Sequence, residues 1–85
     1  MNKQELRDQL IKDVQQVMGT EYKEVYFEKA LPHQSGSRVK FVTKDRPSEE
    51  LIEALVDVEH VRYPMYMMTS DVPGILLMTD VEMHE

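Results

Sequence analysis

Apolar residues near the start of the chain recur with the period of a helix. The pattern begins after Asn2, a favoured N-cap, and stops at Gly19, a residue that commonly ends helices. Glu5 stands three residues after Asn2, which adds a capping-box pattern. We therefore predict a helix over residues 3–18. Its apolar face would consist of Leu6, Leu10, Val14, Val17 and Met18, with Ile11 beside them.

The next segments alternate with the period of strands. Residues 21–31 and 38–44 are rich in β-branched and aromatic side chains, and the stretch PHQSGS between them is typical of a turn. We expect a hairpin in which one face is apolar and the other is charged. Acidic side chains on the outer face of the first strand would then oppose basic side chains on the second. The residues predicted to face the core are Val25, Phe27, Leu31, Val39 and Phe41.

A second helix and a second hairpin follow. Pro47 is expected at the first helical position, where its missing N–H costs no hydrogen bond, and the helix should end near residue 58 or 59. The strand-like stretches HVRYPMYMMT and GILLMTDVEM flank Pro73 and Gly74, a pair that favours the centre of a type II turn. Pro64 lacks a donor for a sheet ladder, so its strand should lie at an edge, or Pro64 should stand at the strand's start.

The element order α-β-β-α-β-β predicts an α+β fold. Two helices on one face of a four-stranded antiparallel sheet would bury one apolar layer. The 85 residues suit a single domain, 1–85, whose small core would gain from oligomerisation. Leu10-Ile11 and Leu51-Ile52 are 41 residues apart, as are Tyr22 and Tyr63, a spacing consistent with a decayed tandem repeat of 1–46 and 47–85.

The second hairpin differs from the first because both of its faces are apolar. Strict alternation places Met65 and Met67 on one face and Tyr66 and Met68 on the other. An antiparallel sheet covered on one side shows clean alternation, so its loss indicates that a partner covers the second face. Aromatic and Met side chains are typical of interface cores. The predicted interface consists of Tyr66, Met68, Leu76 and Met78.

The net charge of −6 is unevenly distributed. Residues 1–46 carry nine Lys and Arg against seven Asp and Glu, whereas residues 47–85 carry one against nine. This balance argues against direct nucleic-acid binding by the acidic half, since phosphate binding needs Lys and Arg. A basic protein partner fits better. Its expected contact is an acidic face spaced at i, i+4 and i+8 on the second helix: Glu49, Glu53 and Asp57.

The first hairpin shows a weaker nucleic-acid pattern. Its basic residues are interleaved with Tyr22 and Tyr26, as on sheets that stack single-stranded bases on aromatic rings. Glu24 and Glu28 on the same strand neutralise the field, so we expect no nucleic-acid site here. The basic residues in question are Lys23, Lys29, Arg38, Lys40 and Lys44.

Two groups of residues have side chains that could bind a metal ion. The methionines of Met65-x-Met67-Met68 resemble a thioether cluster for Cu(I), but alternation divides them between two faces. Asp80 and His84 flank Glu82 at alternate positions and would share one face of a strand, where they could hold a divalent ion; the other interpretation is a solvated acidic terminus. We predict no metal and no cofactor.

Other chemistry finds little support in the sequence. There is no cysteine, no serine stands in a G-x-S-x-G motif, and the first residues lack the apolar stretch of a signal peptide. No apolar run approaches the roughly 18 residues of a membrane span, so we expect a cytoplasmic protein that binds no membrane.

These patterns lead to one favoured functional hypothesis and two alternatives. The favoured one is a small non-enzymatic interaction module, a homodimeric adaptor or chaperone-like protein joined through the C-terminal hairpin. The first alternative is an acidic inhibitor or regulator from a mobile element that mimics nucleic acid toward a basic target. The second is a small-ligand or enzymatic domain with a site at a dimer interface.

Overall fold

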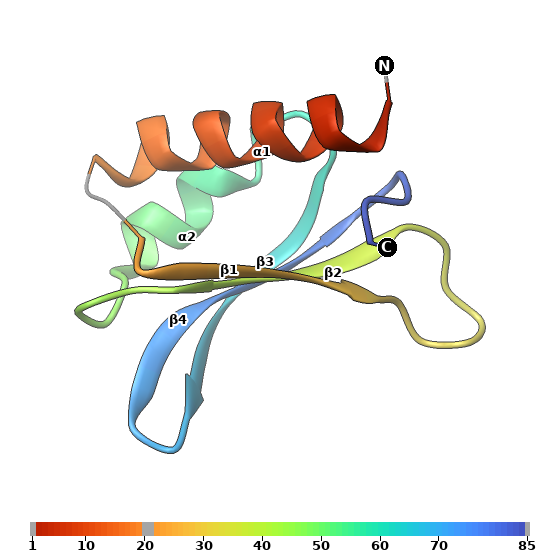
Figure 1. Cartoon of the computed structure of the whole chain (residues 1–85). Coiled ribbons are helices and arrows are strands. Elements are labelled where there is room, and N and C mark those ends of the chain that lie inside the picture. The colour runs from red at the N-terminus through yellow and green to blue at the C-terminus, as the bar shows by residue number, and fades with distance from the viewer. Residues whose placement is uncertain (1, 20–21, 85) are drawn as a thin grey trace.

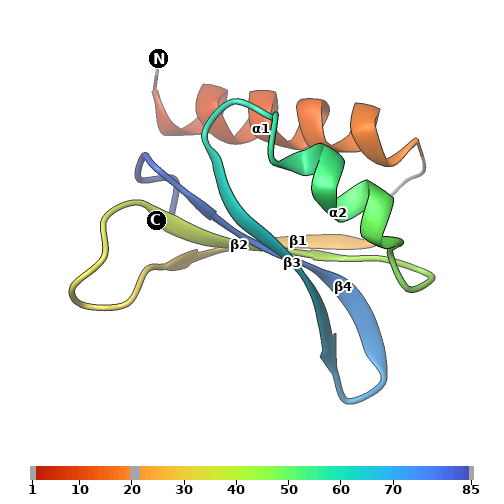
Figure 2. The same cartoon turned by 180° about the vertical axis from the view of Figure 1, so that it is seen from behind.

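The computed structural model describes residues 2–19 and 22–84, and Figure 1 shows them arranged in two layers. The strands form a four-stranded antiparallel sheet in the order β1-β2-β4-β3, with β1 and β3 at its edges. Both helices cover the same face of this sheet (Figures 1 and 2), so the predicted α+β fold is confirmed. Along the chain the elements are α1 (Lys3–Met18), β1 (Glu24–Lys29), β2 (Ser37–Val42), α2 (Glu49–Leu55), β3 (Val61–Thr69) and β4 (Val72–Thr79).

Helix α1 is bounded by the residues that the sequence pattern singled out. The side-chain oxygen of Asn2 accepts a hydrogen bond from the backbone N–H of Glu5 (2.9 Å), and the Asn2 amide donates one to Glu5 Oε1 (2.9 Å). At the other end Gly19 adopts φ 69°, a left-handed conformation that costs glycine little. The prediction of a helix over residues 3–18 is confirmed.

The paired residues of the first hairpin have the predicted faces, but Leu31 does not face the core as expected: β1 ends at Lys29, and Leu31 lies in the following loop, 47% exposed. Phe27 on β1 lies opposite Val39 on β2, on the side of the sheet that the helices cover. On the other face, Lys40 Nζ lies 2.9 Å from Glu28 Oε1. The expected pairing of acidic and basic side chains across the two strands is therefore present.

Helix α2 begins later and ends earlier than expected, and it spans Glu49–Leu55. Ser48, rather than the residue before Pro47, caps it, because Ser48 Oγ accepts the backbone N–H of Leu51 (3.1 Å). Pro47 thus precedes the cap and does not occupy the first helical position. The helix ends at Leu55, after which backbone hydrogen bonds join residues three apart, as in the 3.1 Å bond from Val58 to Leu55.

The turn of the second hairpin is not at Pro73 and Gly74, so that prediction was wrong. Ser70 and Asp71 form it with φ values of 50° and 64°, the pattern of a type I′ turn, whose twist matches that of the flanking strands. Pro73 and Gly74 lie inside β4. Glycine is needed there because a Cβ atom at residue 74 would lie 2.4 Å from the carbonyl oxygen of Phe41.

Strand β3 contains a bulge that changes which way its side chains face. Arg62 lies opposite Met78 and Met65 opposite Leu76, so that the two residues Tyr63 and Pro64 occupy the place across from one residue of β4. Tyr63 has φ 51°, which accommodates the extra residue. Pro64 lies on an edge strand, as predicted.

The core lies between the helices and the sheet. It also receives the C-terminal segment, residues 80–84, which turns back beneath α1 (Figure 1). Met83 is fully buried, and its backbone N–H donates to Ser37 Oγ (2.7 Å) while its carbonyl oxygen accepts from Arg7 Nε. This segment is packed and is not the solvated terminus considered above. The buried apolar side chains are Leu10, Val14, Val39, Phe41, Leu55, Val61, Ile75, Leu77 and Met83.

Candidate functional site

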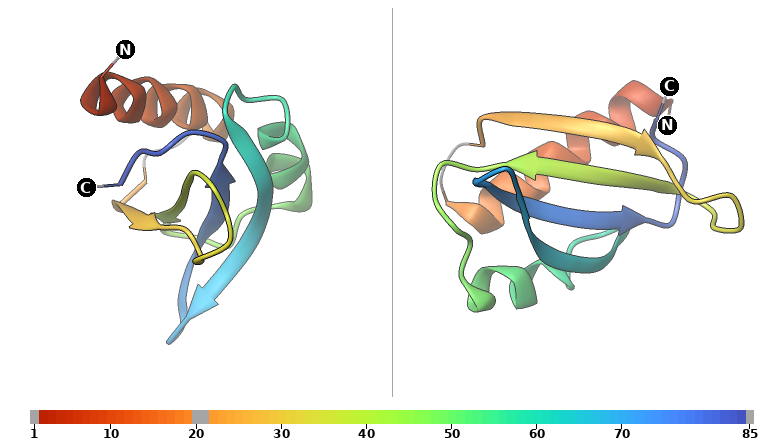
Figure 3. Two further views of the ribbon diagram at one scale, coloured as in Figure 1. Left: turned by 90° about the vertical axis from the view of Figure 1, so that its right-hand side faces the viewer. Right: turned by 90° about the horizontal axis from the view of Figure 1, so that it is seen from below.

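The sheet face opposite the helices carries no covering element from the described part of the chain, and Figure 3 shows it in the view from below. We call it the open face. Its side chains alternate along the strands with the buried core residues, such as Phe41 and Ile75. The strand register arranges them in three rows, each running from β1 through β2 and β4 to β3. The rows are Glu24, Val42, Gly74, Met67; Tyr26, Lys40, Leu76, Met65; and Glu28, Arg38, Met78, Arg62.

The open face is apolar on its β4 and β3 side. Met65 is 47% exposed and Tyr26, across the sheet on β1, is 48% exposed, although both are large side chains with apolar surface. Leu76 lies beside Met65 in the same row, Met67 and Met78 lie in the neighbouring rows, and all three are half-buried. A contiguous apolar surface on one side of a small protein is typical of an interaction site.

The structure separates the four residues predicted to form one interface. Leu76 and Met78 lie on the open face, as expected. Tyr66 pairs with Ile75 in the register, so it faces the helix side instead, and Met68 has the same orientation. The prediction that the four share one face was wrong, because the bulge shifts the alternation of β3 by one residue.

Tyr66 takes part in a separate contact on the helix side. The guanidinium of Arg46 lies 4.4 Å from the centroid of its ring, a cation–π geometry. Its hydroxyl is buried and finds no hydrogen-bond partner among residues 2–19 and 22–84. Met68 is 51% exposed near the tip of the hairpin.

Charged groups occupy the β1 edge of the open face. The Tyr26 hydroxyl donates a hydrogen bond to Glu24, and this bond, together with the carboxylate charge, raises the pKa of Tyr26 above its ordinary value of 10.0. Lys40 pairs with Glu28 in the next row. Since carboxylates stand among the basic side chains, this face lacks the uniform positive field that phosphate binding requires.

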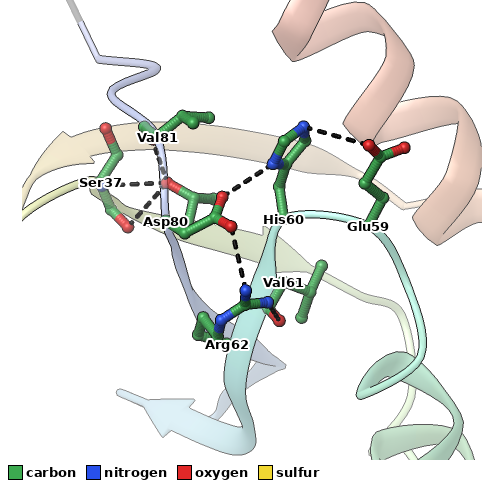
Figure 4. Close-up of polar contacts among 8 residues, drawn as sticks. Ser37, Glu59, His60, Val61, Arg62, Asp80 and Val81 are labelled. Atoms are coloured by element: carbon green, nitrogen blue, oxygen red, sulfur yellow. Dashed lines mark hydrogen bonds and ion pairs between the residues drawn. The ribbon is translucent and has the colours of Figure 1, made fainter.

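The opposite corner of the open face carries a polar cluster that the sequence pattern did not reveal (Figure 4). Asp80 accepts from Arg62 Nη2 (3.0 Å) and lies 2.8 Å from His60 Nδ1, while the exposed Glu59 lies 3.7 Å from the other ring nitrogen. The backbone N–H of Asp80 also donates to the His60 carbonyl (3.2 Å). The cluster ties the start of β3 to the end of β4 and holds Arg62 in place. In the sequence, the indication of this cluster is that His60 and Asp80 stand just outside the two strands of the second hairpin.

The acidic residues predicted to bind a partner lie on the helix side. Glu49 and Glu53 belong to α2, whereas Asp57 follows the end of the helix in a turn. All three are exposed, and none contributes to a row of the open face. Their role as a binding surface stays a prediction.

The three residues weighed as ligands of a divalent ion, Asp80, Glu82 and His84, do not come together as one group. Strand β4 ends before Asp80, so the three side chains no longer alternate on a shared strand face. Asp80 binds Arg62, Glu82 pairs with Lys3 (2.9 Å), and His84 Nδ1 lies 2.9 Å from Ser37 Oγ. Within the described residues no group of three or more His, Asp or Glu side chains could hold a metal ion.

The methionines are divided between two faces, as the sequence predicted. Met65 and Met67 lie on the open face, while Met68 lies on the other. This division removes the third thioether from the arrangement considered for Cu(I).

Comparison with known proteins finds no family model that matches the chain, and neither a curated protein nor a solved structure similar to it. Among the described residues, no helix is long and apolar enough to cross a membrane.

Proposed function

We propose that this chain is a non-enzymatic protein–protein interaction module that forms a homodimer through the open face of its sheet. The observation that carries the proposal is the row Tyr26, Lys40, Leu76 and Met65 across the uncovered face, in which Tyr26 and Met65 are exposed and Leu76 is half-buried. Antiparallel sheets with one solvated face normally place polar residues on it. Here water would meet an aromatic ring and several thioethers.

A second copy could cover this face without a rearrangement of the fold. Sheets pack face to face at about 10 Å, with the side chains of both filling the space between them. The strands that carry the apolar side chains are held by the core on their other face, so the surface is preorganised for association. A chain of this size has a modest core, and burial of a second apolar layer would add to its stability.

The test replaces one side chain of the open face with a charge. Leu76→Lys should convert the dimer to a monomer in light scattering, because a buried lysine at the centre of the interface would lose its hydration without gaining a partner. Met68→Lys is the matched control, since Met68 is also exposed but faces the helix side. It should remain a dimer. Circular dichroism would establish that both variants keep the fold.

Two results would contradict the proposal. The first is a monomeric wild-type chain at all concentrations tested. The second is a dimer that survives Leu76→Lys but dissociates in Met68→Lys, which would move the interface to the other face of the hairpin.

A further inference from the structure

We propose that the two copies are related by a two-fold axis parallel to the strands, between β2 and β4, so that Glu28 of each copy lies over Arg62 of the other. This inference rests on the proposed function and specifies the pairing across that same face. The partner is therefore a second copy of this chain, recognised by charge as well as by its apolar surface.

The rows of the open face decide which side chains meet. A rotation about an axis parallel to the strands keeps each row and reverses the order of the strands, so β1 lies over β3 of the second copy and β2 over β4. In the middle row Tyr26 then faces Met65, and Lys40 faces Leu76 with its apolar stem. In the last row Glu28 faces Arg62, which joins opposite charges at two symmetric corners.

The other face-to-face arrangement joins like charges. In that arrangement the two-fold axis lies in the plane of the interface and runs perpendicular to the strands. Each strand then lies over the same strand of the second copy, and the order of the rows is reversed. Glu24 would then lie over Glu28 of the second copy, and Lys40 would lie over Lys40. Like charges placed opposite each other in an interface cost free energy, so charge distinguishes the two arrangements.

Glu28 and Arg62 are both positioned to reach a second copy. The Arg62 side chain is 52% exposed, and Asp80 and the Val61 carbonyl hold its guanidinium at the corner of the face. The Glu28 side chain is 39% exposed and is oriented by Lys40. Because the intrachain partners already fix both groups, little side-chain entropy would be lost when the two copies meet.

The shape of the sheet is compatible with this arrangement. Figures 1 and 2 show that the tip of the β3–β4 hairpin turns away from the helices, toward the side of the open face. With the strand order reversed, each hairpin tip lies on the β1 side of the other copy, and only its open-face side, which does not carry Met68, would face the charged edge of the partner's sheet. The two hairpins thus lie on opposite sides of the interface.

Cross-linking can determine the axis because the chain has no cysteine. Tyr26→Cys and Met65→Cys variants would be mixed and treated with a bis-maleimide whose reach is about 10 Å, the distance between packed sheets. We expect a covalent dimer in the mixture and none with either variant alone. A covalent dimer of Tyr26→Cys alone would indicate the perpendicular axis and overturn the inference.

The design separates the two proposals. If light scattering shows a dimer that Leu76→Lys dissociates but the mixture yields no cross-link, the arrangement is wrong while the interaction surface stands. If the wild-type chain is monomeric, both proposals fail.

A charge exchange tests the ion pair itself. Glu28→Arg and Arg62→Glu should each weaken the dimer by about tenfold or more at low salt, because each places like charges together, and the double variant should recover most of the loss. The double variant is needed because each single change also removes an intrachain contact, with Lys40 or with Asp80. A double variant no tighter than the weaker single variant would overturn the pairing.

Discussion

At the scale of single residues, the Ser37 side chain joins strand β2 to the C-terminal segment. It is fully buried at the start of β2, and its hydroxyl oxygen accepts the backbone N–H groups of Met83 (2.7 Å) and His84 (3.1 Å). With both lone pairs engaged, the hydroxyl proton points to His84 Nδ1 at 2.9 Å, so this nitrogen acts as the acceptor. One hydroxyl therefore fixes the C-terminal segment against the sheet.

Ser37→Ala should destabilise the fold by about 1–3 kcal/mol, because two N–H groups would be left without their acceptor. Urea denaturation would measure the change in the free energy of unfolding. Ser35→Ala, in the exposed loop before β2, is the control and should change it by less than about 0.5 kcal/mol. Equal effects of the two changes would mean that the C-terminal segment is not held as described.

The ion pair of Lys3 and Glu82 predicts a dependence on pH. Its hydrogen bond and charge lower the pKa of Glu82 below its ordinary value of 4.5. A carboxyl whose pKa is lower in the folded state stabilises the fold above the unfolded-state pKa, and this contribution is lost as the pH falls. Glu82→Gln should therefore be less stable than wild type at neutral pH, and the difference should shrink below pH 4.5.

Urea midpoints of both proteins across this range would provide the measurement. Because both side chains are largely exposed, the effect should be small and should weaken with added salt. A difference that grows as the pH falls would contradict the assignment. Glu53→Gln, on the exposed side of α2, serves as a comparison.

At the scale of elements, the second hairpin is defined by its turn and its bulge. Ser70 and Asp71 both have positive φ, a conformation that Asn and Gly adopt with less strain. Replacing the pair with Asn-Gly should stabilise the protein by up to about 1 kcal/mol, measured as a rise in the melting temperature. A lower melting temperature would indicate that the chain does not turn at these residues.

The same hairpin shows where sequence patterns suffice and where they fail. Alternation placed the faces of β1 and β2 correctly because six regular pairs, from Glu24 opposite Val42 onward, contain no irregularity. In β3 the bulge at Tyr63 and Pro64 reverses the pattern, and a proline in a strand does not by itself say whether the ladder slips. Pro73 and Gly74 suggested a turn, but the close approach of Phe41 is a tertiary contact that no local pattern contains.

The sequence shows the composition of the C-terminal segment, but it does not show where this segment packs in the fold. Met83 is an apolar residue among charged ones, which a solvated terminus would also tolerate. Its burial depends on Ser37, which is 46 residues away in sequence. The cluster around Asp80 depends in the same way on the geometry of a long hairpin, since His60 and Asp80 are 20 residues apart.

At the scale of the whole molecule, the edges and the open face are the surfaces on which another chain could add. The bulge and Pro64 interrupt the free edge of strand β3, and such features limit pairing with a strand of another chain. If two β1 edges paired antiparallel around Tyr26, Glu24 would stand opposite Glu28 of the second copy, an unfavourable pair of like charges. The open face has no such conflict when the strand order is reversed, which is why we propose that the copies associate through the face.

The methyl groups of methionine offer the most direct test of this assignment. The chain has seven methionines, and three of those in the sheet, Met65, Met67 and Met78, lie on the open face. With ¹³C-labelled Met methyl groups, NMR spectra would be recorded as the protein is diluted. We predict that these three signals shift as the dimer dissociates, while those of the buried Met83 and the helix-side Met68 do not. Shifts confined to Met68, or no shift of these three signals while light scattering shows the dimer dissociating, would contradict an interface on the open face.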